Sequence, residues 1–153
     1  MKREILFRGF HPDENGPQEI TLNGQKIRGR WVEGWYCGKT CDTPFSKARE
    51  SAQILDSELL WYEVIPETVG QEIGLPDKKG KKIFEGDVLS HFINYHGRRI
   101  NGVVAYDITL AAYMWEPKGL SSLFLTDVLS GNGAEIIGNI HDNPELIEGE
   151  VQE

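Results

Sequence analysis

The chain has 153 residues, of which 39% are hydrophobic and 26% are charged, enough apolar material to close the core of one domain or of two joined subdomains. Its net charge of −8 is concentrated in residues 51–153, where seventeen Asp/Glu oppose seven Lys/Arg, whereas residues 1–50 carry nine Lys/Arg and seven Asp/Glu. Because non-specific nucleic-acid binding depends on cations that neutralise phosphates, this acidic charge disfavours DNA or RNA as a partner.

The sequence also indicates where the protein works. No stretch approaches the roughly 18 consecutive apolar residues of a membrane helix. Residues 1–8 lack the apolar run and the cleavage site of a secretion signal, so we expect a cytoplasmic protein without a membrane segment. Two cysteines, Cys37 and Cys41, are too few for a disulfide scaffold.

The first part of the chain is predicted to form strands, because short apolar runs are broken by Gly, Pro, Asn and Asp at close intervals. Asn23-Gly24 lies between two such runs and favours a type I′ turn, which predicts a hairpin over residues 19–37. Pro66 ends a further strand, since proline cannot donate to a sheet ladder. We expect residues 1–65 to form an N-terminal β subdomain with strands at 5–10, 19–22, 26–37 and 58–65, while the polar stretch 38–53 stays ambiguous.

A short helical segment is predicted over residues 69–73. Thr68 stands three residues before Gln71, which is the spacing of a capping box, and Gly74 is suited to end a helix in the left-handed conformation. The turn residues 76–80 follow, and they lead back into extended chain.

The last part of the chain is predicted to form a small barrel, because five short runs alternate apolar and polar residues only loosely, as expected when a sheet curls. Asn143 and Pro144 combine with Gly149 as the start and stop signals of a closing helical turn. We therefore expect a mainly β protein in which residues 66–153 hold an SH3-like small barrel with one or two short helices and strands at 87–93, 102–107, 111–116, 122–125 and 135–140.

Two segments resemble the signatures of a known family. Residues 67–88 and 135–146 are similar to the central and closing signatures of the YopX family, and residues 3–9 and 31–36 also fit. Two features depart from the pattern: Pro76 replaces a more usual Lys, and residues 37–56 match nothing in particular. The resemblance implies a mainly β protein of phages and prophages of low-GC Gram-positive bacteria, with an unassigned role and no catalytic residues to carry over.

Candidate chemical groups are few. Cys37 and Cys41 have the spacing of half a zinc site, but no second pair accompanies them in the usual sequence context. His91 and His96 are five residues apart, but on a strand and its loop this spacing says little, so we expect no metal or other cofactor. Asp77, Glu85 and Asp87 lie close in sequence, and we interpret them as turn acids that accept backbone N–H groups. No Ser/His/Asp grouping or phosphate-binding glycine loop is present, so the chain is not predicted to be an enzyme.

Candidate surfaces are more informative. A basic turn is formed by Lys78, Lys79, Lys81 and Lys82, and Arg98 and Arg99 add to its positive charge if their loop lies nearby. This turn either binds a polyanion or is a solvated sheet edge that deters aggregation. Trp115 is the aromatic residue that we expect to be exposed at an interface. Packing in the core or between strands is expected for Trp31, Trp35, Tyr36, Trp61 and Tyr62.

Two functions from different classes fit these observations. The first is an accessory module that binds a host or phage protein or a second copy of itself, since an acidic surface and the lack of catalytic groupings favour recognition over chemistry. The alternative is a nucleic-acid-associated small barrel that uses the turn from Lys78 to Lys82.

Overall fold

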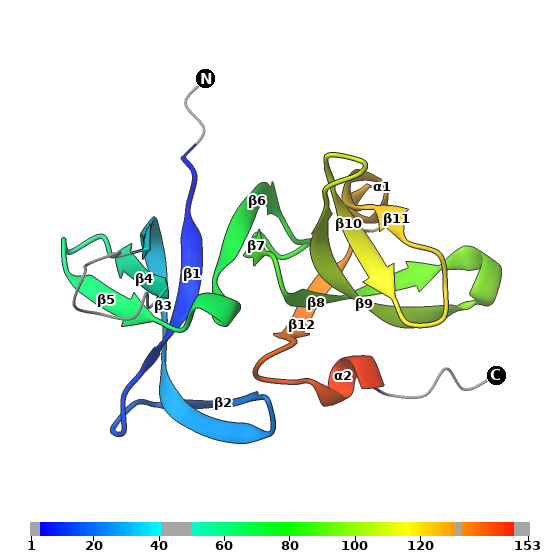
Figure 1. Ribbon diagram of the computed structural model, residues 1–153. Coiled ribbons are helices and arrows are strands. Elements are labelled where there is room, and N and C mark those ends of the chain that lie inside the picture. The colour runs from blue at the N-terminus through cyan, green and yellow to red at the C-terminus, as the bar shows by residue number, and fades with distance from the viewer. Residues whose placement is uncertain (1–3, 41–49, 131–132, 149–153) are drawn as a thin grey trace. The chain divides into compact units, whose positions relative to one another are not determined.

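The computed structural model describes residues 4–40, 50–130 and 133–148, and it confirms a mainly β fold (Figure 1). Twelve antiparallel strands account for most of this described part, with two short α-helices and two 3-10 turns. None of these helices combines the length and the apolar character that crossing a bilayer requires. The chain divides into two compact units, Met1–Glu72 and Ile73–Glu153.

The first unit is a sheet with the strand order β5-β4-β3-β1. Its long strand β3 changes partner along its length, pairing first with β2, then with β1 and finally with β4. Asn23 and Gly24 have φ angles of 50° and 78°, which confirms the predicted hairpin turn. The strands are β1 (Phe7–Pro12), β2 (Gln18–Leu22), β3 (Gln25–Thr40), β4 (Glu50–Leu55) and β5 (Trp61–Val64).

The sheet of the first unit curls until the end of β5 meets β1. The Ile65 backbone N–H donates to the Phe10 carbonyl at 2.9 Å, which ties the end of β5 to β1. Gly9 permits this approach, since a Cβ there would lie 2.8 Å from Val64 Cγ2. The buried core inside the curl consists of Val32, Ala52, Ile54 and Val64, against which Phe7, Tyr62 and Val69 pack.

The predicted helix over residues 69–73 is wrong. A 3-10 turn, η1 (Pro66–Thr68), is followed directly by strand β6 (Gly70–Pro76), whose first residues pair with β1. The Thr68 hydroxyl does not cap a helix: it accepts the Phe10 backbone N–H at 2.9 Å and donates to the Ile65 carbonyl at 2.6 Å. Tertiary ladder bonds to β1 therefore replace the local capping bonds that the sequence suggested.

The second unit contains a five-stranded sheet in the order β11-β10-β9-β8-β12, and the five predicted strands are confirmed. Its β12 carries a register shift between Ile136 and Gly138. Within the described residues β11 and β12 are the two edges of this sheet, so closure into an SH3-like barrel stays a prediction. The elements are β7 (Lys82–Phe84), β8 (Asp87–Ile93), η2 (Asn94–His96), β9 (Arg98–Asp107), β10 (Ala112–Pro117), β11 (Leu123–Phe124), α1 (Leu125–Leu129), β12 (Glu135–Asn139) and α2 (Glu145–Glu148).

Trp115 lies at the centre of the second unit's core, and the expectation that it is exposed is wrong. Its side chain is 0% exposed, and its indole N–H donates to the Leu89 carbonyl at 3.1 Å. The pairing of Trp115 with Val104 directs its ring to the covered face of the sheet. The other buried members of this core are Ile73, Ile83, Leu89, Val104, Leu125, Val128 and Ala134.

Candidate interaction surface

Two tryptophans and the leucine between them form a row across three strands of the first unit. Trp35 on β3 pairs with Leu55 on β4, and Leu55 pairs with Trp61 on β5. Directly opposed residues in antiparallel strands point to the same face, so the three side chains are neighbours. Trp35 is 44% exposed and Trp61 is 55% exposed, while Leu55 between them is half-buried. We call Trp35, Leu55 and Trp61 the aromatic row.

The aromatic row lies on the face opposite the core. The next row, one residue further along each strand, consists of Tyr36, Ile54 and Tyr62. Its central residue, Ile54, is 0% exposed and belongs to the core of the unit. The expectation of core packing is therefore wrong for Trp35 and Trp61, because alternation in a strand rich in aromatic residues does not reveal which face is covered.

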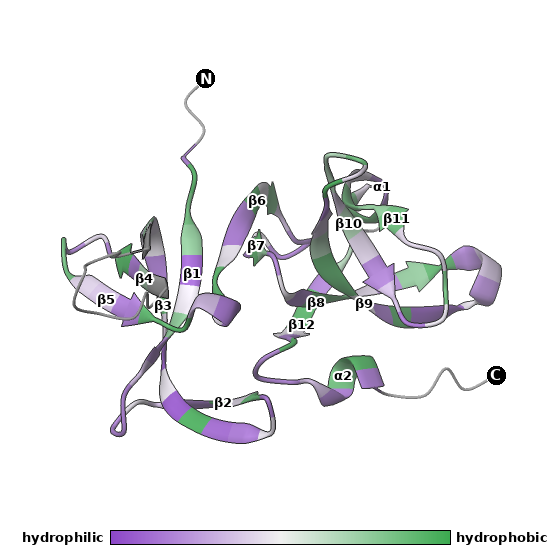
Figure 2. Ribbon diagram, in the orientation of Figure 1, coloured by the Kyte–Doolittle hydropathy of each residue, from purple (hydrophilic) through white to green (hydrophobic). Residues whose placement is uncertain are grey.

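The turn before β5 adds two exposed leucines, Leu59 and Leu60, which are 71% and 50% exposed. In Figure 2 the connection between β4 and β5 changes from the hydrophilic colour to the hydrophobic colour where it enters β5. The Asp56 carboxylate organises the turn, since its Oδ1 accepts the backbone N–H groups of Glu58 at 2.9 Å and of Leu60 at 3.0 Å. We call Leu59 and Leu60 the leucine tip.

Leu59 adopts a left-handed backbone conformation with φ of 65°. A side chain in this region costs about 1–2 kcal/mol relative to glycine, because its Cβ crowds the following carbonyl. The turn thus holds a strained leucine whose side chain is mostly in solvent, where it contributes little to the core. The sequence signal for this feature was the pair Leu59-Leu60 directly after the polar turn residues 56–58.

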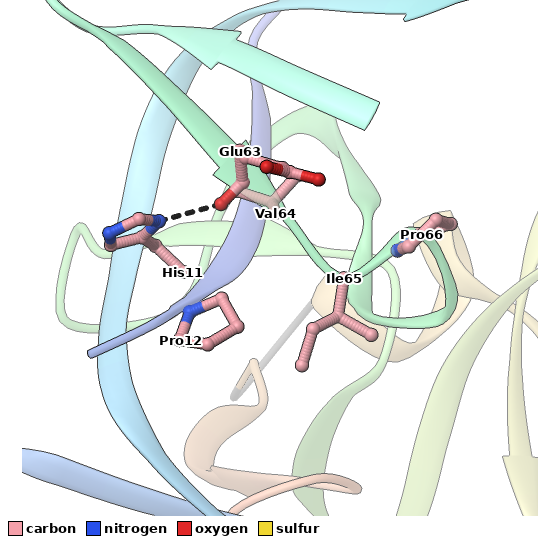
Figure 3. Close-up of a pocket in the computed structure, with 6 residues that line it drawn as sticks. All are labelled: His11, Pro12, Glu63, Val64, Ile65 and Pro66. Carbon is pink, nitrogen blue, oxygen red and sulfur yellow. Dashed lines mark hydrogen bonds between the residues drawn. The ribbon is translucent and has the colours of Figure 1, made fainter. Parts of the chain in front are cut away.

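A pocket of about 380 Å³ lies where β1 meets the end of β5 (Figure 3). His11 closes this seam: its Nδ1 donates to the Glu63 carbonyl oxygen at 2.6 Å, while the Glu63 carboxylate points away from the ring. The remaining lining residues are Pro12, Val64, Ile65 and Pro66, which offer no second proton carrier to the imidazole. His11 is thus placed to hold two strands together.

The basic turn between β6 and β7 is built around a buried acid. Asp77 is 5% exposed, and its Oδ1 accepts the backbone N–H groups of Lys79 at 2.9 Å and Lys81 at 2.8 Å. Its Oδ2 accepts the N–H of Ile136 at 3.1 Å. Asp87 is likewise buried and accepts the Phe84 N–H at 2.8 Å. This confirms that Asp77 and Asp87 are turn acids.

Two of the four lysines of this turn are already paired within the protein. Lys78 Nζ lies 3.3 Å and Lys79 Nζ lies 2.5 Å from the carboxylate of Glu135 on β12. Hydrogen bonds from Lys79 and then from Lys78 lower the pKa of Glu135, and Glu135 in turn raises the pKa of Lys79. Glu135 carries a single negative charge, so it offsets one of the four positive charges of the turn, and Lys81 and Lys82 are exposed to solvent.

The two arginines lie on a different hairpin. Arg98 and Arg99 begin β9, opposite Ile93 and Phe92 at the end of β8. The Arg99 guanidinium donates to the Ser90 carbonyl at 3.4 Å, so it is engaged with its own hairpin. A single basic surface that joins the arginines to the lysine turn stays a prediction.

The structure describes one of the two cysteines. Cys37 is a free thiol on β3, half-buried and opposite Gln53, whereas Cys41 lies outside the described residues. Across residues 4–40, 50–130 and 133–148, no group of three or more His, Cys, Asp or Glu side chains is arranged to hold a metal ion.

These observations define a mainly β protein of two small units with an aromatic surface on the first. Residues 6–148 match the YopX protein family, so the chain belongs to that family, as its signature segments indicated. Among solved structures, the chain is similar to protein EF1440 from Enterococcus faecalis, with 23% sequence identity and a TM-score of 0.49 over 95% of this chain and 99% of that one. The search of curated proteins finds no match.

Proposed function

We propose that this YopX protein is a non-catalytic interaction module that binds a partner protein through the aromatic row. The observation that carries the proposal is the pair Trp35 and Trp61, about half exposed on one outer face with Leu55 between them. Tryptophan is enriched at the centres of protein interfaces, because a rigid aromatic ring buries a large area at a small cost in conformational entropy.

The strained leucine tip supports this proposal. Left-handed backbone at a residue other than glycine persists where the surrounding structure enforces it, and such strain concentrates at binding sites. Here the Asp56 carboxylate enforces the turn and holds Leu59 in solvent beside the strand that carries Trp61. A partner that covers Leu59 and Leu60 would recover the hydrophobic free energy that the free protein forgoes.

A catalytic role has less support. The acids that lie close in sequence, Asp77 and Asp87, have carboxylates that accept backbone N–H groups. His11, the imidazole in the pocket, is held by a carbonyl. The family resemblance adds the setting, which is a phage or prophage accessory protein in the cytoplasm of a bacterial host. The alternative, nucleic-acid binding by the lysine turn, has less support because Lys78 and Lys79 already share an ion pair with Glu135 inside the protein.

Affinity capture from a bacterial lysogen tests the proposal. The tagged protein is compared with the double variant Trp35→Ala/Trp61→Ala and with Tyr95→Ala, which removes an aromatic ring that is 93% exposed on the other unit. We expect a specific protein to be recovered with wild type and with Tyr95→Ala but lost with the double variant. Recovery that is equal for all three proteins, or recovery of nucleic acid alone, would contradict the proposal.

A further inference from the structure

Two acidic side chains flank Trp61 in the sequence, at the β5 end of the aromatic row. Glu63 lies two residues after Trp61 on β5, and residues two apart in a strand share a face. Glu58 is in the turn that carries the leucine tip. Both side chains are exposed, and in the part of the chain that the structure describes neither pairs with a cation. Within residues 4–40, 50–130 and 133–148, these two carboxylates thus have no cationic partner.

The third nearby carboxylate differs from these two. Glu33 precedes Trp35 by two residues on β3, but it lies directly opposite Arg8 on β1. Arg8 also places its guanidinium 5.0 Å from the centre of the Trp31 ring. The negative charge at the β3 side of the row is thus partly balanced by Arg8. At the β5 side, the described residues Glu58 and Glu63 contribute negative charge.

From this arrangement we propose that the partner presents a cationic segment, in which an apolar anchor residue lies between Lys or Arg side chains. This inference rests on the proposed function and adds the chemistry of the partner. A segment docked on Trp61 reduces the water around Glu58 and Glu63, which strengthens their attraction to a cation and makes an acidic neighbour costly. The exposed faces of Trp35 and Trp61 add cation–π attraction for the same side chains.

Two synthetic peptides test the charge of the partner. Both are short amphipathic helices with leucine at the same positions, and the polar positions are lysine in one and glutamate in the other. Titration of the labelled peptides with the full chain, followed by fluorescence anisotropy, measures each Kd. We expect the leucine–lysine peptide to bind about tenfold tighter or more, with a preference that narrows as salt is raised.

Charge-matched variants separate a local effect from the effect of net charge. Glu58→Lys/Glu63→Lys reverses the carboxylates beside the row, and Glu14→Lys/Glu116→Lys makes the same change in net charge at two other exposed positions. We expect the first pair to remove the preference for the leucine–lysine peptide and the second pair to retain most of it. Trp61→Ala should weaken the binding of that peptide, and Tyr95→Ala should leave it unchanged.

Three results overturn the inference. Equal weakening by the two charge-reversing pairs would show that the peptide senses only net charge. Binding that is unaffected by Trp61→Ala would place the peptide elsewhere on the chain. Equal binding of both peptides, lost in Trp61→Ala, would reject a cationic partner while leaving the aromatic row as a docking surface, so this outcome distinguishes the inference from the proposed function.

Discussion

The indole of Trp115 occupies the space that a side chain at Gly102 would need. A Cβ built on Gly102 would lie 2.5 Å from the ring, on the strand next to that of Trp115. We expect Gly102→Ala to lower the free energy of unfolding by about 1–3 kcal/mol, because the ring is fully buried and cannot move aside without strain. Urea denaturation measures this change, and Ser122→Ala, at an exposed position, is the control. Unchanged stability in Gly102→Ala would contradict the packing.

Glycine should suit the backbone at Leu59 better than leucine does. We expect Leu59→Gly to leave the free energy of unfolding unchanged or to raise it by about 1 kcal/mol, because relief of the left-handed strain outweighs the entropy gained by the unfolded chain. The same variant should weaken partner binding, which is a trade of function against stability.

Gly80→Ala is the matched control for Leu59→Gly. Gly80 also has a positive φ, of 84°, with open space around it, so alanine there adds backbone strain without a clash. We expect a loss of about 1 kcal/mol in its free energy of unfolding. A clear loss of stability in Leu59→Gly would show that the leucine side chain stabilises the fold.

The carboxylate of Asp77 should be a main determinant of the β6–β7 turn. It accepts three backbone N–H groups, and hydrogen bonds to a charged acceptor contribute about 1.5–3 kcal/mol each. We expect Asp77→Ala to lower the free energy of unfolding by about 3 kcal/mol or more, and Lys81→Ala, at an exposed side chain, to change it little. Chemical denaturation of both variants measures the difference; similar stabilities would remove the carboxylate from this role.

His91 should make stability depend on pH. Burial lowers the pKa of His91 below its ordinary 6.5, and the positive charge of nearby Arg99 lowers it further. A hydrogen bond with the Gly133 backbone raises this pKa but does not cancel the effect of burial. The unfolded chain therefore binds a proton at a higher pH than the folded chain does. This contribution to stability is fully present above pH 6.5 and is lost as the pH falls toward the lowered pKa.

A series of unfolding curves across this range tests the pH dependence. The free energy of unfolding should fall less steeply with acidification in His91→Gln than in wild type. His96→Gln, at an exposed histidine, should keep the wild-type slope. If all three slopes coincide, His91 does not titrate differently in the folded protein.

Local chemistry accounts for the elements that the sequence predicted correctly. Asn23-Gly24 supplies two residues that tolerate positive φ, so the β2–β3 hairpin forms as expected. The helix over residues 69–73 failed because the Thr68 hydroxyl accepts the backbone N–H of Phe10, a distant residue on β1 that no local spacing reveals. Strand β4 was missed because the stretch from 38 to 53 carries few apolar residues to mark a strand.

The sequence by itself determined the mainly β class and the strand positions of the second unit, because both depend on short apolar runs and local turn residues. It also determined the family, because the family signatures are contiguous motifs. Only the tertiary structure decided which aromatic residues are covered. The side chain of Trp115, like that of Val104 opposite it, is on the covered face of its sheet, while Trp35 and Trp61 face solvent. The physical reason is that alternation assigns side chains to two faces, whereas burial depends on which face other strands close over.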